Sequence, residues 1–383
     1  VQNDVTVGDV ELALREGYSN VEHVKRYTTG GMGIDQGKTG NINIIGTVAA
    51  AQGTHLPEVG TTTFRPPYTP VSFGAVSGLR EGSVVLPYRH TPITRWNHGR
   101  GAFMYEAGAR WRRPGYFPRP GESDWQTSCD REVRTVRDAV GVCDVSTLGK
   151  IDIQGPDAGR FLDFVYTNMF STLPVGRTRY GLMLREDGHV MDDGTTARLG
   201  DAHYVMTTTT AAAGQVMRHL DFVHQAHVPG WDVRMISVTE HWAQLAVAGP
   251  KSRELLNTIL DTPLAEEAFA FMACGPVSVM GVSGRLFRIS FSGEHAYEIA
   301  VPARYGDALY RDLVARAETL GGGAYGMEAL NVLRIEKGFI THAEIHGRVT
   351  AFDIGLQGMM SRKKDFVGKA ASQRPGLLGT SRE

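Results

Sequence analysis

The 383-residue sequence has no excess of charge of either sign and no long hydrophobic run. Its 40 lysine and arginine residues balance 41 aspartate and glutamate residues, giving a formal net charge of -1. This balance argues against a nucleic-acid-binding groove and against an acidic solvating tail. Since no apolar run could cross a bilayer and no signal-peptide core is present, we expect no membrane partner and no nucleic-acid partner. A chain of this length should form two or more domains.

Cysteine is scarce, with three residues at positions 129, 143 and 274. They are far apart and odd in number, and no CxxC pair is present. A disulfide framework is therefore excluded as the basis of the fold, and a reducing compartment is favoured. We expect a cytoplasmic protein.

Several motifs of known enzyme classes are also missing. The chain has no GxGxxG motif, which argues against a Rossmann sheet, and no GxSxG nucleophile elbow. Gly37-Lys38-Thr39 looks like the end of a P-loop, but Met32 stands where that motif requires glycine. A structural loop is the favoured interpretation there.

Histidines offer little support for a metal site. His342 to His346 reads HxExH rather than HExxH, although on a strand His342, Glu344 and His346 would share one face. His224 and His227 are three residues apart on a predicted helix and have no third ligand in the sequence. We expect no metal.

The chain divides by composition into four parts. Residues 1–53 should form a small helical module, with a helix start at Thr6 or Asp9, an interruption at Gly17 and a further helix over 41–52. Residues 54–90 are rich in proline, glycine and threonine, and Pro66, Pro67 and Pro70 favour an extended linker. Residues 91–372 should be the main region, and 373–383 a polar tail.

The main region alternates helices and strands in an α+β pattern. We predict a helix in 128–145, a half-buried strand in 149–155 and a helix after Pro156 with Phe161, Leu162 and Val165 on its buried face. A hairpin should turn at Gly200-Asp201, and helices should cover 251–259 and 304–319.

Asp192 and Asp193 stand side by side at the start of a predicted strand. Because successive strand side chains point to opposite faces, one should face inward and the other outward. The outward one can bond local backbone, as turn aspartates do. The inward one loses hydration and needs a partner or a function. Two turn aspartates without a function are the simpler alternative.

Glu298 lies between Tyr297 and Ile299 in another predicted strand. It is either on the polar face of an edge strand, which the pattern alone favours, or a lone carboxylate in an apolar pocket. A carboxylate of the second kind suits a planar heterocycle with adjacent N–H and NH₂ donors, such as a pterin.

Six collinear motifs between residues 90 and 372 resemble those of the tetrahydrofolate-dependent aminomethyltransferases, the T-proteins of the glycine cleavage system. They include REVRTVRDAVGVCDVSTLGKIDIQGPDAGRFLDFVYTN, LPVGRTRYGLMLREDGHVMDDG, LAVAGPKSRELL, RISFSGEHAYEIAVP, AYGMEALNVLRIEKGF and KKDFVGKAA. Within that superfamily, VQNDVTVGDVELALREG and EVGTTTFRPPYTPVSFGA resemble the α subunits of heterotetrameric sarcosine oxidases.

The resemblance implies an aminomethyltransferase-like fold of interleaved mixed domains behind the helical module. It also implies a dinucleotide-binding half upstream of Val1 and a C-terminal barrel after Glu383, so we expect the sequence to be a fragment with a truncated barrel.

The resemblance assigns roles to four residues. Asp193 falls on the folate-site aspartate, the catalytic position, and is thus the inward one of the pair. Glu298 falls on the pterin-binding glutamate, Tyr180 on a cleft tyrosine, and Phe291 on the aromatic residue of the TGYTGE turn, without its hydroxyl. Two further family positions differ: Leu330 replaces an arginine, and an asparagine is replaced near Thr208.

The implied activity is that of a sarcosine oxidase α subunit. A flavin-bearing β subunit would oxidise an N-methyl amine, and this subunit would capture the one-carbon unit on tetrahydrofolate, giving 5,10-methylene-tetrahydrofolate and glycine. Small γ and δ subunits are the other expected partners, and flavin (FAD or FMN) and NAD should bind in the missing half or in partner subunits. The alternatives are a stand-alone aminomethyltransferase and a non-catalytic folate-binding or assembly module.

Overall fold

The computed structural model describes residues 2–66, 68–78, 87–265 and 269–378. The chain forms two compact units, Val1–Pro87 and Tyr88–Glu383, which are treated separately here. None of the helices in the described ranges is long and apolar enough to span a membrane.

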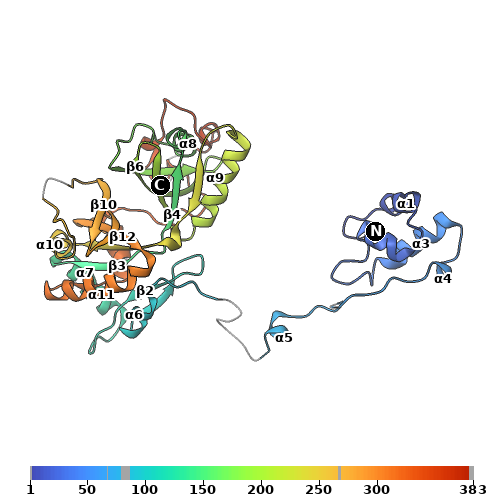
Figure 1. The fold of residues 1–383 in the computed structure, drawn as a ribbon, viewed down its shortest axis with the longest axis horizontal. Coiled ribbons are helices and arrows are strands. Elements are labelled where there is room, and N and C mark those ends of the chain that lie inside the picture. The colour runs from blue at the N-terminus through green and yellow to red at the C-terminus, as the bar shows by residue number, and fades with distance from the viewer. Residues whose placement is uncertain (1, 67, 79–86, 266–268, 379–383) are drawn as a thin grey trace. The chain divides into compact units, whose positions relative to one another are not determined.

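The first unit is a small helical bundle (Figure 1). Its first helix begins at Thr6 because the Thr6 hydroxyl accepts from the backbone N–H of Asp9, while the Asp9 carboxylate accepts from the N–H of Thr6. Val10, Val24 and Ile44 are buried together between the helices. The predicted N-cap, the break near Gly17 and the helix over 41–52 are confirmed. The helices are α1 (Val7–Arg15), α2 (Val21–Thr28) and α3 (Asn41–Gln52).

The predicted extended course of 54–90 is wrong in two places, since it contains the one-turn helices α4 (Leu56–Val59) and α5 (Phe73–Ser77). The Ser72 hydroxyl starts α5 by accepting from the N–H of Ala75, and Glu58 closes a similar cap at α4. Pro67 and residues 79–86 lie outside the described residues.

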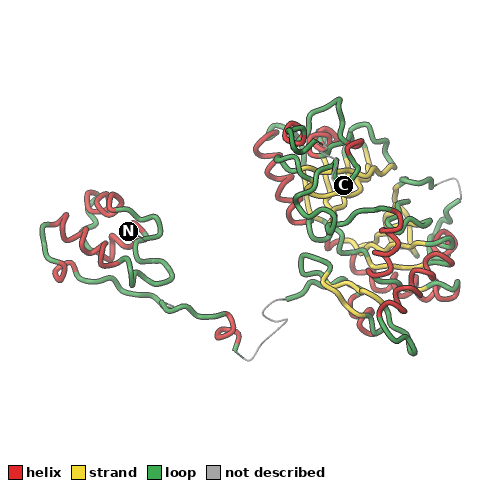
Figure 2. Tube along the Cα trace, turned by 180° about the vertical axis from the view of Figure 1, so that it is seen from behind, coloured by secondary structure: helices red, strands yellow, loops and turns green. Residues whose placement is uncertain are grey.

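The second unit is built on two main sheets and a small hairpin (Figures 1 and 2). One sheet is antiparallel throughout and comprises, in spatial order, β5 (Arg177–Leu184), β6 (Val190–Gly200), β7 (His203–Thr208), β4 (Gly149–Gln154) and β8 (Arg234–Ser237). The other sheet comprises β10 (Cys274–Val279), β11 (Val282–Phe287), β12 (Ala296–Pro302), β9 (Trp242–Ala248), β3 (Gly141–Asp144) and β13 (Gly323–Ala324). The hairpin pairs β1 (Phe103–Glu106) with β2 (Arg112–Tyr116).

The two sheets are interleaved along the chain, as the predicted α+β fold requires. The chain enters the six-stranded sheet at β3, builds the whole five-stranded sheet from β4 to β8, and returns at β9, which pairs with β3. Distant sequence segments are thereby brought together at the β3–β4 and β8–β9 connections.

Helices cover the sheets with apolar faces. On the five-stranded sheet, Phe161, Leu162 and Val165 of α8 are fully buried, as predicted, and α9 runs beside β4 (Figure 1). On the six-stranded sheet, α11 packs over β3 and β9, while α7 and α12 pack against each other. The helices are α6 (Thr94–Gly99), α7 (Trp125–Asp138), α8 (Ala158–Val165), α9 (Ala213–His227), α10 (Ser252–Asn257), α11 (Gly306–Thr319), α12 (Met327–Lys337) and α13 (Lys369–Ser372).

Two local predictions in this unit are wrong. The helix predicted in 128–145 stops at Asp138, and its last part is the buried strand β3, whose apolar residues fit either period. The strand β4 is buried on both faces rather than half-buried, because β7 and β8 flank it and helices cover it. The turn at Gly200-Asp201 and the helices near 251–259 and 304–319 are confirmed.

Candidate functional site

The adjacent aspartates Asp192 and Asp193 lie near the start of β6, opposite Met183 and Leu182 of β5. They point to opposite faces of the strand, but the prediction that one faces solvent is wrong. Asp192 is 3% exposed, and Oδ1 of Asp193 is also fully out of water. Asp193 itself is half-buried, so its face of the strand is partly covered, which the sequence period alone does not reveal.

Both carboxylate oxygens of Asp192 are hydrogen-bonded to Thr209. Its Oδ1 accepts from the Thr209 hydroxyl at 2.8 Å, and its Oδ2 accepts from the Thr209 N–H at 3.1 Å. Burial and the charge of Asp193 raise the pKa of Asp192. The carboxylate therefore ties the end of β7 to β6 and offers no oxygen to a ligand.

Asp193 is only half satisfied. Its Oδ2 accepts from the Tyr180 hydroxyl at 2.7 Å, while its Oδ1 is buried without a hydrogen-bond partner. Burial raises the pKa of Asp193 to about 6, against the stabilising bond from Tyr180. A carboxylate with one free oxygen and a pKa close to neutrality is suited to exchanging a proton.

Glu344, from the HxExH segment, lies near enough to Asp193 to disfavour its ionised form. The segment is a turn rather than the strand that would place its histidines on one face. Burial alone would raise the pKa of Glu344, but hydrogen bonds from Arg334, at 2.8 Å, and from Thr341 lower it to about 2. Within the described ranges no group of three metal-ligating side chains occurs.

Glu298 lies in the middle of β12 and is buried, so the interpretation as an exposed edge is wrong. It is flanked by β11 and β9, and its Oε2 accepts from the side-chain amide of Gln244. Burial raises the pKa of Glu298, while the Gln244 bond and the cations Lys150 and Arg113 oppose this shift.

Three charged residues around Glu298 are not identified as site residues by the sequence. Lys150 is 2% exposed, donates to the carbonyls of Ser146 and Leu148, and has its pKa lowered to about 8 by burial. Asp144 is wholly buried, and Arg113 nearly so. The available signal was the run GKIDIQ, in which Lys150 and Asp152 share one face of a strand that turns out to be covered.

Of the positions at which the chain departs from the family, Thr208 lies beside Asp192 and Asp193, since all three line one small pocket. Phe291, in the turn before β12, is 37% exposed and stacks on Phe339 with ring centroids 6.2 Å apart. Leu330 packs on the core shared by α7 and α12. Thr208 is buried and donates to the carbonyl of Thr209.

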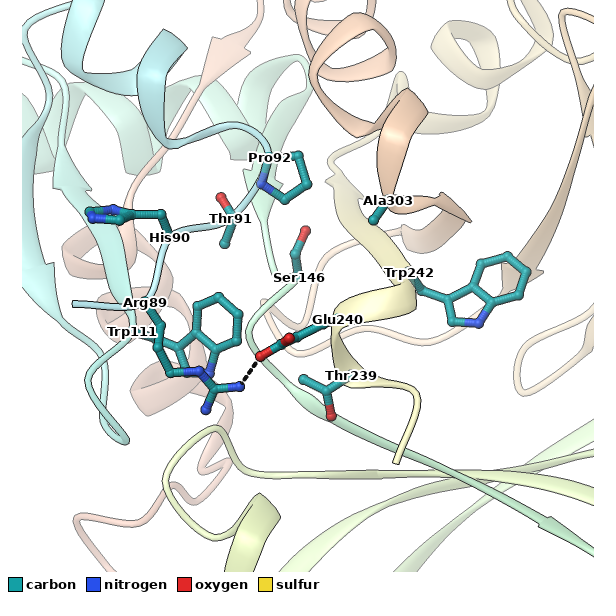
Figure 3. A pocket seen from close by; sticks show the side chains of 10 residues that line it. All are labelled: Arg89, His90, Thr91, Pro92, Trp111, Ser146, Thr239, Glu240, Trp242 and Ala303. Carbon is teal, nitrogen blue, oxygen red and sulfur yellow. Dashed lines mark hydrogen bonds and ion pairs between the residues drawn. The ribbon is translucent and has the colours of Figure 1, made fainter. Parts of the chain in front are cut away.

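A cavity of about 410 Å³ lies beside the beginning of β9 (Figure 3). Arg89 lies over the Trp111 ring at 4.1 Å and pairs with Glu240 at 2.5 Å, while Thr91 donates to Asp144 at 2.6 Å. This charged pair is already satisfied, so the cavity is a weaker candidate than the half-satisfied carboxylates. Its lining is Arg89, His90, Thr91, Pro92, Trp111, Ser146, Thr239, Glu240, Trp242 and Ala303.

The candidate site therefore has two parts, on different sheets. Asp193 and Tyr180 belong to the five-stranded sheet, and Glu298 to the six-stranded one, with no hydrogen-bond partner in common. The Gly37-Lys38-Thr39 segment is a turn whose N–H groups bond to Asp35, and no strand precedes it. His224 is bonded to the carbonyl of Trp231.

Comparison with known proteins places this site in a family context. Residues 93–364 match the family model described as the GCVT N-terminal domain, and residues 1–79 match the sarcosine oxidase A3 domain. The sarcosine oxidase subunit alpha of Rhizobium meliloti (strain 1021) is 53% identical over the whole chain, which covers 39% of that relative. The counterpart from Corynebacterium sp. (strain P-1) is 43% identical, with 100% of the chain and 40% of the relative covered.

Aminomethyltransferases are more distant relatives. That of Thermotoga maritima is 28% identical over 74% of both chains. The crystal structure of the glycine cleavage system aminomethyltransferase T from Bartonella henselae matches with a TM-score of 0.64 at 23% identity, covering 74% of this chain and 73% of the other. This structural match supports the fold. The chain spans about two fifths of the length of the sarcosine oxidase relatives.

Proposed function

The chain belongs to the GCVT family, and from this premise we propose that it is the folate-binding part of a sarcosine oxidase α subunit. Homology to such subunits over the whole chain supports the assignment. The proposed activity is transfer of the one-carbon unit of an oxidised N-methyl amine to tetrahydrofolate, leaving glycine. When bound, tetrahydrofolate would supply the nitrogen nucleophiles that accept this unit.

The observation that carries the proposal is the half-satisfied carboxylate of Asp193. Its buried Oδ1 has no partner, whereas Oδ2 is held by Tyr180. In this role the ionised carboxylate of Asp193 would first stabilise positive charge on the one-carbon unit, and its Oδ1 would then take the proton from a folate nitrogen, which leaves Asp193 neutral. The Tyr180 hydroxyl fixes the direction of the carboxylate. Holding the two reactants together would contribute further, since it limits loss of the unit to water.

Glu298 is proposed to hold the pterin ring. A buried carboxylate kept near cations remains a strong acceptor, and the adjacent N–H and NH₂ groups of a pterin match its two oxygens. Phe291, exposed and stacked on Phe339, would flank the mouth of the site. These residues fit folate, because Asp193 keeps a buried oxygen without a partner and Glu298 presents a buried carboxylate.

We assign the remaining steps of the reaction to polypeptide outside residues 1–383. A flavin-bearing β subunit would oxidise the amine, with small γ and δ subunits in the same hetero-oligomer, and flavin and NAD would bind outside residues 1–383. A cytoplasmic location fits this metabolic role. The alternative is a T-protein-like activity on a carrier protein. Similarity to the more distant aminomethyltransferases supports this alternative.

The test is Asp193→Asn in the full chain with its co-purifying subunits. Asn can still accept from Tyr180, so we expect tetrahydrofolate to bind nearly as well while one-carbon transfer slows by about two orders of magnitude, as for loss of a general base. The partition between methylene-tetrahydrofolate and formaldehyde, and folate binding by titration, are the measurements.

Asp192→Asn is the matched control, because Asp192 is bonded to Thr209 and should leave the partition unchanged. An unaltered partition in Asp193→Asn would contradict the role of Asp193. Turnover with a lipoyl carrier protein and no flavoprotein partner would support the alternative activity.

A further inference from the structure

Arg113, in the middle of β2, is a buried arginine with incomplete bonding. It is 6% exposed, and among the described residues it has no carboxylate within salt-bridge distance. Its Nη2 donates to Sγ of Cys143 at 3.5 Å, which is a weak acceptor, and its Nε is buried without any partner. An unpaired guanidinium donor in a protein interior is costly and needs an explanation.

The surroundings of this donor are those of the proposed pterin anchor. Arg113 donates to Cys143 of β3, and Cys143 lies opposite Ala246 of β9, which in turn lies opposite Glu298 of β12. The charge of Arg113 favours the ionised form of Glu298, and both charges act on Tyr325. The Tyr325 hydroxyl is likewise buried without a partner. Two unused donors therefore belong to the surroundings of the Glu298 carboxylate, to which Gln244 donates from its side-chain amide.

The position of Arg113 is fixed by the elements on either side of it. Glu132 of α7 accepts from the N–H of Phe117, just after β2, at 2.7 Å, and from the N–H of Gly326, just before α12, at 2.8 Å. Gly326 lies directly against the carbonyl of Gly115, so β2 and the start of α12 are in close contact. A buried side chain on a strand held in this way is pre-organised for a ligand.

The chemistry of a pterin supplies the missing acceptor. The 2-amino group and the N3–H, which match a carboxylate such as Glu298, are adjacent on the ring to the lactam oxygen at C4. A ring anchored by that edge brings this oxygen into the interior, where it loses water and requires a donor. The Glu298 carboxylate only accepts and so does not meet this requirement, and the amide of Gln244 donates to Glu298, whereas the Nε–H of Arg113 is unused.

We propose that Arg113 is a specificity-determining residue of the pterin site, whose free Nε–H donates to the lactam oxygen of a ring held by Glu298. The inference rests on the proposed folate-binding function and adds to it a residue outside the recognised family motifs. It makes the site selective for 4-oxo pterins over 4-amino pterins, because an amino group at C4 would oppose a donor with a donor.

The experiment compares binding of tetrahydrofolate and of its 4-amino-4-deoxy counterpart to the full chain with its co-purifying subunits. The variants are Arg113→Met and Arg113→Lys, with Arg112→Met as the matched control. Arg112 is half-buried, donates to the carbonyl of Met104 and stacks on Tyr88, so it is an arginine of the same strand with other partners.

We expect the unmodified protein to prefer the 4-oxo ligand by about ten- to hundredfold, the range for a hydrogen bond from a charged donor. Arg113→Met should weaken tetrahydrofolate binding by that factor, leave the 4-amino ligand nearly unaffected and so abolish the preference. Arg113→Lys should reduce the preference, since lysine keeps the charge without the Nε–H, and Arg112→Met should retain it.

The outcomes separate the two levels of the proposal. If the unmodified protein does not bind tetrahydrofolate, both the proposed function and this inference fail. If it binds, but Arg113→Met weakens both ligands equally, Arg113 acts only through structure or charge, and the inference fails while the function stands. If Arg113→Met does not fold, as judged by thermal unfolding, Arg113→Lys decides: an unchanged preference overturns the inference and a reduced one supports it.

Discussion

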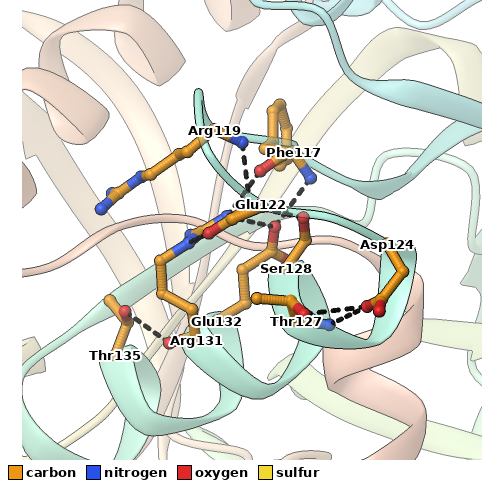
Figure 4. Close-up of polar contacts among 9 residues, drawn as sticks. All are labelled: Phe117, Arg119, Glu122, Asp124, Thr127, Ser128, Arg131, Glu132 and Thr135. Carbon is orange, nitrogen blue, oxygen red and sulfur yellow. Dashed lines mark hydrogen bonds and ion pairs between the residues drawn. The ribbon is translucent and has the colours of Figure 1, made fainter.

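Glu132 provides the sharpest physical test of the structure, because its carboxylate accepts from the N–H of Phe117, just after β2 (Figure 4), and from the N–H of Gly326, just before α12. Both oxygens accept backbone N–H groups, which favours the ionised form. Burial outweighs those bonds and raises the pKa of Glu132 to about 7, from an ordinary value of 4.5. The folded protein therefore binds this proton more tightly than the unfolded chain.

The sign of the pH dependence follows from linkage. The stability contributed by a raised pKa is fully present below about pH 4.5 and is lost as the pH rises through about 7. A rise from 4.5 to about 7 corresponds to about 3 kcal/mol of unfolding free energy, at ~1.4 kcal/mol for each pH unit. In Glu132→Gln this dependence is absent, because the amide does not titrate.

The prediction is a change in the stability gap between the unmodified protein and Glu132→Gln. Between pH 5 and pH 8, the free energy of unfolding of Glu132→Gln should increase by about 2–3 kcal/mol relative to that of the unmodified protein. Urea unfolding at the two pH values measures it. The same difference in unfolding free energy at both pH values would show that Glu132 is not buried as described.

Glu122→Gln is the control from the same group of residues. Glu122 accepts from Arg131 and Ser128, and the bond from Arg131 lowers its pKa to about 2 (Figure 4). Glu122 is therefore ionised in both the folded and the unfolded state between pH 5 and 8. Its stability gap should stay constant across that range, which separates the effect of Glu132 from general acid sensitivity.

Two further predictions concern the site and its support. Tyr180→Phe removes the bond that stabilises ionised Asp193, so the pKa of Asp193 should rise further and the pH profile of one-carbon transfer should move to higher pH; a profile that stays in place would contradict the contact. Gly326→Ala should reduce the unfolding free energy by about 1–3 kcal/mol in urea titrations, since its Cβ would collide with the Gly115 carbonyl, whereas Gly323→Ala meets no atom and should cost less.

Local elements could be predicted from the sequence where a short-range signal fixes them. The N-cap at Thr6, the break near Gly17 and the buried face of Phe161 and Leu162 depend on neighbours within a turn or two. β3 was missed because its apolar residues continue the helical period of α7, and only pairing with β9 makes that segment a strand. The apolar period of this segment fits either a helix or a strand, and pairing with a neighbouring strand decides between them.

The sequence predicts only part of the candidate site. Sequence motifs indicate Asp193 and Glu298, but the period of a strand cannot say whether its second face is covered. Asp192 and Lys150 are consequently buried where the pattern predicts solvent or gives no signal. Arg113 gives no signal at all, since it belongs to a run rich in arginine whose other members, Arg110 and Arg112, lie over the Tyr88 ring, with Arg110 also paired with Glu106.

The surroundings of the two carboxylates assign them different tasks. Burial raises the pKa of Glu298, and the hydrogen bond from Gln244 and the nearby cations Lys150 and Arg113 oppose this shift. The groups acting on Asp193 are Tyr180 and Glu344, neither of which is a cation, and its pKa is raised to about 6. Two carboxylates whose environments differ in this way divide binding from proton transfer. Under the proposed roles, the cations lie beside the residue that would hold the ring, whereas no cation of the described residues is among the groups that shift the pKa of Asp193.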